Sequence, residues 1–155
     1  MPNPTFAQNM KNAILADLQS LVQSGILNSA FADEMTKVNP LDRNWPGYPS
    51  AVVIPPTVSN SEFYDTATNL RDYTWYIMVV TTPDNIPSTD PTYLEGLIDN
   101  LLQVFDNDVT LQGMAVGGVQ PAVLEAPGPV NSGDNTYVVF CVTIKAKQLV
   151  PAAVQ

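Results

Sequence analysis

The sequence predicts an α+β fold, in which a mostly antiparallel β-sheet has two α-helices packed on one face. Segments 69–80 and 136–147 concentrate β-branched and aromatic residues, as strands do. Segments 6–24 and 91–106 repeat apolar residues at steps of three and four, which is typical of amphipathic helices. The expected order is helix, strand, strand, helix, strand, strand, so both helices can cover the same side of one sheet.

The segment 69–80 is predicted to be an inner strand, because both of its faces carry apolar residues. One face has Tyr73, Trp75, Ile77 and Val79, and the other has Thr74, Tyr76, Met78 and Val80. The segment 136–147 is its expected neighbour. One side of that segment is apolar, and the other becomes polar towards Lys145 and Lys147, so a half-buried strand is expected there.

The ends of the first helix have recognisable signals. Thr5 and Gln8 have the spacing of a capping box, so we expect the helix to begin at about Phe6. Gly25 can adopt the left-handed conformation that ends a helix. The second helix is expected to begin after Asp90 and to end near Asp106.

The rest of the chain is expected to consist of short strands and connections. Turn residues dominate from about 29 to 50, a long connection of the kind that often contacts another subunit. Within it, Trp45 and Tyr48 could anchor an interface or could cover the core. The other expected features are a short strand at 51–54 closed by Pro55–Pro56, a strand or hairpin arm from 62–65, an edge strand near 116–124, a turn at 131–135, and an extended or disordered C-terminal arm at 149–155.

Length, charge and cysteine content limit the class of protein. The 155 residues predict a single domain, and no apolar run approaches the roughly 20 residues of a membrane-spanning helix. The net charge of −9 disfavours gripping DNA by its phosphates, although DNA could pass an acidic wall without sticking to it. No signal peptide is visible at the first residues. Cys141 is the single cysteine, so no internal disulfide is expected.

The sequence contains little catalytic chemistry. It has no histidine, which removes the commonest general base and excludes serine–histidine and cysteine–histidine catalysis. The glycine motifs that bind phosphates or dinucleotides are missing as well. We therefore expect no enzyme activity, no metal and no cofactor, and a structural or assembly role instead. Arg71, at the mouth of the central strand, is expected to form an ion pair with Asp65, Asp72 or an acid of a neighbouring subunit.

The segments quoted above also resemble a known family. An N-terminal amphipathic helix, the proline-flanked strand 48–54, the strand Asn69-Leu70-Arg71-Asp72-Tyr73-Thr74-Trp75-Tyr76-Ile77-Met78-Val79 and the helix with Leu94-Glu95-Gly96-Leu97-Ile98-Asp99 follow one another. Together they are similar to the tail terminator proteins of long-tailed bacteriophages, from about residue 6 to 147. The likeness lies in element order and texture, and segments 29–49 and 115–130 have no counterpart in it.

The resemblance implies a virion protein of the phage tail and neck, assembled in the cytoplasm of the host bacterium. A homohexameric ring would cap the tail tube, stop its polymerisation and join the tail to the connector of the head. Its partners would be further copies of itself, the tail tube protein and the head-completion protein, with DNA passing through the lumen without specific binding. Six chains would carry 6 × (−9) = −54 charges, which would discourage DNA from adhering.

A ring needs two different contact patches on each subunit, because its contacts are head-to-tail. The expected candidates are Trp45 and Tyr48 on one side, and Arg71, Lys145 and Lys147 on the other. Two alternative functions remain open at this point. One is a head-completion, neck or tail tube protein of a phage, and the other is a monomeric small-molecule binding domain or an unrecognised enzyme.

Overall fold

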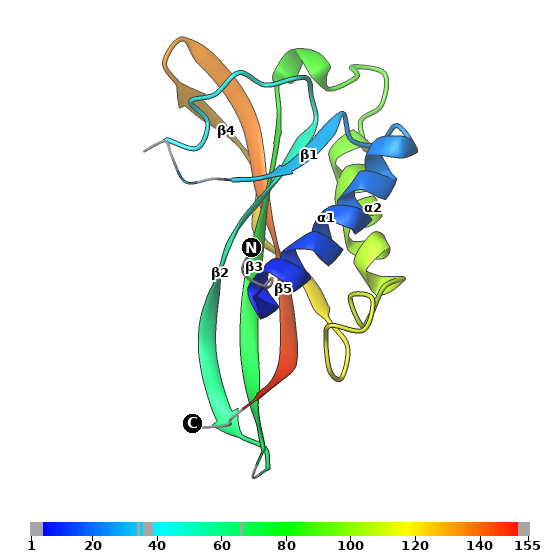
Figure 1. The fold of residues 1–155 in the computed structure, drawn as a ribbon. Coiled ribbons are helices and arrows are strands. Elements are labelled where there is room, and N and C mark those ends of the chain that lie inside the picture. The colour runs from blue at the N-terminus through cyan, green and yellow to red at the C-terminus, as the bar shows by residue number, and fades with distance from the viewer. Residues whose placement is uncertain (1–4, 34, 36–38, 66, 152–155) are drawn as a thin grey trace.

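The computed structural model describes residues 5–33, 35, 39–65 and 67–151 and has an α+β fold (Figure 1). One mostly antiparallel sheet has the strand order β1-β2-β3-β5-β4, and only the β1–β2 pairing is parallel. The elements are α1 (Phe6–Gln23), β1 (Ser29–Ala32), β2 (Ser50–Phe63), β3 (Thr68–Thr81), the 3-10 helix η1 (Pro83–Asn85), α2 (Tyr93–Asp106), β4 (Gln120–Ser132) and β5 (Asn135–Pro151).

Helix α1 begins and ends at the residues that its capping signals predict. The Thr5 hydroxyl accepts from the Gln8 backbone N–H at 3.1 Å, and the Gln8 side chain accepts from the Thr5 N–H at 2.7 Å. After the helix, Gly25 has a φ of +84°, a conformation that a side chain would disfavour. The buried stripe of α1 packs on the sheet and consists of Met10, Ala13, Ile14, Leu18 and Leu21.

The expected inner strand is confirmed as β3, which lies between β2 and β5. β3 and β5 pair without a register shift from Thr68–Pro151 to Thr81–Val138. Alternate residues therefore face opposite sides along both strands. Tyr73, Trp75, Ile77 and Val79 of β3 belong to the core beneath the helices, as do Phe140, Val142, Ile144 and Ala146 of β5.

The long connection at 29–50 is only partly irregular. Residues Ser29–Ala32 form β1, which pairs in parallel with Ser50–Val53 of β2, and the Ser29 and Ser50 hydroxyls lie 2.7 Å apart. The sequence pattern missed β1 because four residues are too few to show a period. Residues 34 and 36–38 of this connection lie outside the described part of the chain.

The predicted end of a strand at Pro55–Pro56 is wrong, since β2 continues to Phe63. Its register with β3 shifts between Ile54 and Thr57, so the two prolines lie in an irregularity of the ladder. The partner strand β1 ends at Ala32, opposite Val53, so beyond Val53 the outer edge of β2 has no strand beside it in the described structure. A proline is tolerated there because its missing N–H removes no ladder bond.

The arm expected from residues 62–65 is the β2–β3 hairpin.

Three further boundaries differ from the prediction. Helix α2 begins at Tyr93, because the Asp90 carboxylate accepts from the N–H and hydroxyl of Thr92 and forms a turn before the helix. It ends at Asp106, as predicted. The edge strand expected at 116–124 is β4, Gln120–Ser132, whose three prolines are compatible with an edge position.

The structure describes the C-terminal arm expected at 149–155 only at residues 149–151, where the chain is extended but paired in the sheet. Residues 149–151 continue β5 and pair with residues 68–70 of β3. The tail carries no charge, and the long β3 strand offers residues 149–151 a ladder to complete. Residues 152–155 lie outside the described part of the chain.

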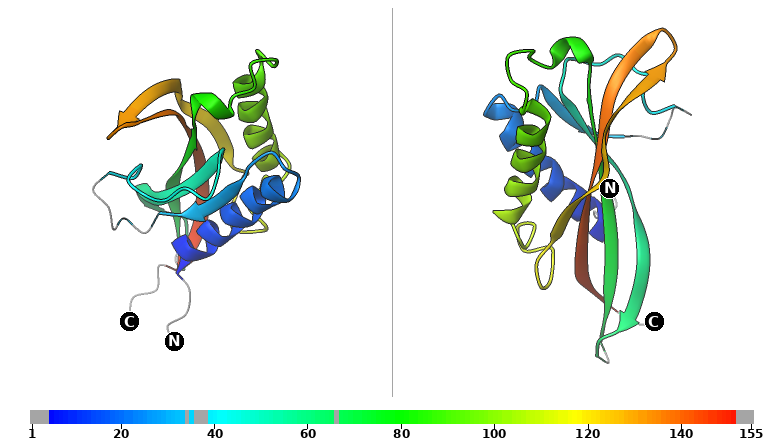
Figure 2. Two further views of the ribbon diagram at one scale, coloured as in Figure 1. Left: turned by 90° about the horizontal axis from the view of Figure 1, so that it is seen from above. Right: turned by 180° about the vertical axis from the view of Figure 1, so that it is seen from behind.

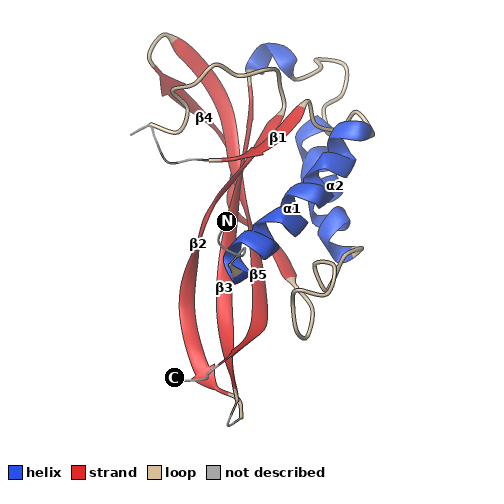
Figure 3. Ribbon diagram, in the orientation of Figure 1, coloured by secondary structure: helices blue, strands red, loops and turns tan. Residues whose placement is uncertain are grey.

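The two helices cover one face of the sheet, as Figures 1 and 3 show from the side and Figure 2 from above and behind. The other face, here called the helix-free face, is covered near β1 by residues 39–49. The distal ends of β2, β3 and β5 extend past both helices and form a three-stranded projection (Figure 1). We call this projection, residues 57–65, 67–72 and 147–151, the sheet arm.

Among the described residues, none of the helices is long and apolar enough to span a membrane.

Replacing Ile77 with alanine tests whether the central strand holds the fold together. Ile77 is 0 % exposed in the core beneath the helices. The Ile77→Ala variant should lose about 2–5 kcal/mol of unfolding free energy, from lost burial and the cavity left behind. Urea unfolding followed by circular dichroism measures this loss. Val123→Ala, at an exposed position of the edge strand β4, is the control and should change stability by less than about 1 kcal/mol.

Candidate functional site

Trp45 and Tyr48 lie in an aromatic cluster on the helix-free face. The Trp45 ring centroid lies 6.0 Å from that of Phe31, 6.2 Å from Tyr48 and 6.4 Å from Tyr137. The indole N–H of Trp45 donates to the Leu41 carbonyl at 3.3 Å. These contacts bind residues 39–49 to the sheet, so both aromatics cover a second, smaller apolar core, with Val52, Met78 and Val80 beneath them.

The Arg43 side chain packs against the outer side of this aromatic cluster. Its guanidinium lies 5.3 Å from the Phe31 ring centroid and 5.4 Å from that of Trp45. The same group forms an ion pair with Asp33 at 3.2 Å, and Nε donates to the Pro40 carbonyl at 2.8 Å. Sequence reasoning missed Arg43, because its role depends on residues from three separate segments. Its cationic head is fully engaged within the subunit.

Tyr48 keeps one polar edge accessible beside this cluster. Partial burial raises the pKa of its hydroxyl, and the neighbouring Tyr137 hydroxyl adds to the shift. The phenol is therefore neutral at physiological pH and available as a hydrogen-bond donor. Tyr48 also lines a cavity of about 420 Å³ together with Tyr93 and Gly96 of α2. The structure thus gives Tyr48 a covering role and leaves part of it facing a surface notch.

Arg71 lies on the opposite side of the sheet from Lys145 and Lys147. It follows the same alternation as Tyr73, and its Nη1 donates to the Tyr73 hydroxyl at 3.2 Å. The prediction that Arg71 pairs with Asp65 or Asp72 is wrong, because neither ion pair forms among the described residues. Asp65 instead accepts from the backbone of the hairpin turn, and Asp72 pairs with Lys147.

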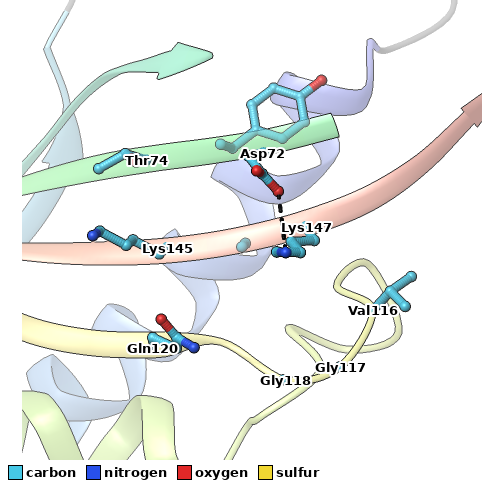
Figure 4. Close-up of a pocket in the computed structure, with 10 residues that line it drawn as sticks. Asp72, Thr74, Val116, Gly117, Gly118, Gln120, Lys145 and Lys147 are labelled. Carbon is cyan, nitrogen blue, oxygen red and sulfur yellow. Dashed lines mark ion pairs between the residues drawn. The ribbon is translucent and has the colours of Figure 1, made fainter. Parts of the chain in front are cut away.

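Lys145 and Lys147 border a cavity of about 540 Å³ on the helix-free face, beside the point where β4 begins (Figure 4). We call it the lysine cavity. Lys147 Nζ lies 3.8 Å from Asp72 Oδ1, whereas Lys145 has no acidic partner within 4.0 Å among the described residues. Its wall is completed by Gln120 and by the glycine pair Gly117–Gly118. Two of the predicted interface residues are therefore brought together, and Arg71 is separated from them.

The tip of the sheet arm exposes two aromatic side chains. Phe63 is 74 % exposed and Tyr64 is 56 % exposed. Asp65 fixes the turn that carries them, since its carboxylate accepts from the N–H groups of Ala67 and Thr68 and from the Thr68 hydroxyl, each at 2.8 Å. These bonds, that of Ala67 first, lower the pKa of Asp65. The aromatics are consequently held out from the arm by an ordered turn.

A pair of carboxyl groups joins α1 to the loop after α2. Asp17 and Asp108 each have a buried Oδ2 without a hydrogen-bond partner. The second oxygen of Asp108 accepts from the Gln112 N–H at 2.9 Å, which fixes the loop. Burial raises the pKa of Asp17 to about 8, with a further contribution from Asp108. At neutral pH the Asp17 carboxyl therefore keeps its proton. No signal in the sequence indicated that Asp17 would lie beside Asp108.

The remaining chemistry of the described residues is modest. No cluster of three or more Cys, Asp or Glu side chains is placed to hold a metal ion within the described ranges. Cys141 is half-buried in β5, and burial, together with the nearby Glu125, raises the pKa of its thiol. The thiol is therefore protonated and a poor nucleophile at neutral pH.

No protein-family model matches this sequence, and no curated protein matches it either.

The carboxyl pair predicts a stability that falls as pH rises. The unfolded chain loses the Asp17 proton near its ordinary pKa of 3.8, whereas the folded chain keeps it to about pH 8. The folded state binds more protons between these values, so its stability is greatest at the acid end and declines towards pH 8. Thermal unfolding midpoints measured from pH 4.5 to 8.5 should show this decline.

Asp17→Asn should flatten that decline, because the amide stays neutral at every pH in the range. Asp106→Asn removes an exposed carboxylate of α2 and is the charge-matched control, which should keep the wild-type slope. Equal slopes for wild type and Asp17→Asn would show that Asp17 does not hold a proton in the folded state.

Proposed function

We propose that the chain is a subunit of a phage tail terminator. Copies join head-to-tail in a closed ring of six, which caps the tail tube, stops its polymerisation and provides the surface for the head connector. DNA passes through the central opening without specific binding. The protein belongs to the neck of the virion and takes part in no catalysis.

The observation that carries the proposal is the exposed apolar tip of the sheet arm. Val58, Phe63 and Tyr64 are between 51 % and 74 % exposed on a projection that the helices do not cover. A chain that worked alone would gain nothing from holding two aromatic rings in water on an ordered turn. Exposed apolar groups of this kind mark contact sites for other protein surfaces.

The edges of the sheet support the same proposal. Within the described residues, no strand pairs with the outer edge of β4, and β1 covers only Ser50–Val53 of β2. Each edge presents backbone groups that another chain can pair with. The two edges differ in sequence and lie at opposite ends of the strand order, which suits a heterologous contact between copies.

The lumen is the natural place for a surface that repels DNA. The net charge of each copy is −9, so a ring presents an acidic wall to the phosphates. Nothing in the proposal requires a bound nucleic acid. This charge supports passage of DNA as opposed to attachment, and it also favours a closed ring over unlimited stacking of like-charged rings.

Light scattering at increasing protein concentration tests the ring. The purified chain should reach about six times its monomer mass of 16.8 kDa and then stop growing. The double variant Phe63→Ser, Tyr64→Ser should lower assembly at least about tenfold, through lost apolar contact area. Val109→Ser changes a 50 % exposed valine far from the arm in sequence and should assemble as the wild type does. Growth into filaments would favour the tube subunit instead.

Electron microscopy of tails tests the terminating role itself. Tails assembled without this chain should be overlong and lack heads, because nothing stops the tube or joins it to the connector. Adding the chain back should restore a uniform length. Tails of uniform length that only lack heads would assign the chain to head completion, and unchanged tails would contradict any role in the neck.

A further inference from the structure

Charge is unevenly distributed along this chain. No lysine or arginine lies between Arg71 and Lys145 in the sequence, although this region contains the whole of α2. Three acids of α2, Glu95, Asp99 and Asp106, recur at steps of four and seven residues and are exposed. They share one side of the helix, which we call the acidic side of α2. None of the three forms an ion pair with a described residue.

A glycine within α2 has no explanation inside the subunit. Gly96 lies in the second turn of the helix and is exposed, and a Cβ added there would meet nothing within 4 Å. Glycine destabilises a helix interior relative to alanine, so an unconstrained position would be expected to carry a side chain. The missing side chain leaves the helix backbone open to close approach from outside. Gly96 is adjacent to Glu95, at the edge of the acidic side.

The lysine cavity has the complementary charge. Lys145 and Lys147 are exposed, and they are two of only six basic residues in the chain. Asp72 lies 3.8 Å from Lys147 and balances one of the two charges, which leaves Lys145 free among the described residues. Figure 4 shows both lysines on strand β5 with Gln120 and the Gly117–Gly118 turn beside them. The cavity of about 540 Å³ is large enough to take several side chains.

We propose that the lysine cavity of one copy receives the acidic side of α2 of the next copy. This inference rests on the proposed ring and specifies which surfaces meet in it. Glu95 and Asp99 would approach Lys145 and Lys147, and Gly96 would let the helix backbone come close to the strands. The contact is head-to-tail, because the lysine cavity and the acidic side of α2 are two different surfaces of the subunit.

A second copy fits this cavity for reasons of charge. Copies with a net charge of −9 repel one another, so a stable contact must place the scarce bases against acids of the neighbour. The acidic side of α2 is the described surface where acids recur regularly beside an unexplained glycine. A contact of this kind sets the register between subunits, and the apolar tip of the sheet arm supplies contact area elsewhere.

Reciprocal charge reversal tests the contact. Lys145→Glu alone and Glu95→Lys alone should each weaken assembly about tenfold or more in light scattering, because like charges then face each other. The double variant Lys145→Glu, Glu95→Lys should recover most of the loss, since every contact again joins opposite charges. Asp134→Lys reverses an exposed acid of the β4–β5 turn and should assemble as the wild type does.

Gly96→Ala separates a contact from a purely structural role. The alanine should raise the thermal unfolding midpoint of the dilute monomer, because the helix is better formed. The same variant should weaken assembly, because the methyl group blocks close approach to the backbone. Assembly at the wild-type level would exclude this role of Gly96, and a lowered unfolding midpoint would show that the glycine serves the subunit itself.

Cross-linking identifies the residues that meet. A carbodiimide joins amines to carboxylates in direct contact, and mixing isotopically labelled with unlabelled chain distinguishes links between copies. Links from Lys145 or Lys147 to Glu95 or Asp99 of another copy are the expected result. Normal assembly of every charge variant would overturn this inference but leave the proposed ring standing. A wild-type chain that remains at 16.8 kDa would overturn both.

Discussion

The pairing of β3 with β5 is the constraint on which the rest of the structure depends. These strands stay in register over their shared length, so each pair of neighbours across the ladder faces the same side. A slip of β5 by one residue along β3 would move Phe140, Val142 and Ile144 from the helix side to the helix-free face. It would also place Lys145 and Lys147 under α1, where two charges would lose water without a partner. The alternation therefore fixes both the core and the polar surface at once.

The two faces of the sheet are closed by different means. The helix side is covered by the apolar stripes of α1 and α2, which need only helical periodicity to form. The helix-free face is covered by residues 39–49, where Trp45, Tyr48 and Arg43 replace regular structure with aromatic and cation–π contacts. That cover does not reach the distal sheet. The lysine cavity and the sheet arm are left open there. The surfaces available for association are therefore those that neither the helices nor residues 39–49 cover.

The sequence predicted those parts of the fold that repeat a pattern, and it missed those that depend on distant partners. The ends of α1, the inner position of β3 and the end of α2 followed from caps and periodicity within one segment. β1 and the continuation of β2 past Pro55–Pro56 depended on which strand lies beside them, and no local signal contains that. Lys145 and Lys147 were expected to act together and do lie together. Arg71 was grouped with them, but it lies two residues from Tyr73 on the same strand. Side chains alternate along a strand, so Arg71 faces the same side as Tyr73 and the opposite side from both lysines.

The net charge of the chain limits how copies can associate. Unit charges separated by more than about 8 Å are largely screened at physiological ionic strength, so the −9 of each subunit acts mainly near the contact itself. Repulsion between distant surfaces is then weak, and the outcome depends on which groups lie within a few ångströms of one another. A contact that buries acids against acids would be costly, whereas one that brings Lys145 near a neighbour's carboxylates removes that cost. Because bases are scarce, few orientations of two copies satisfy this condition. A chain with this composition can therefore remain dispersed when dilute and still select one arrangement when it assembles.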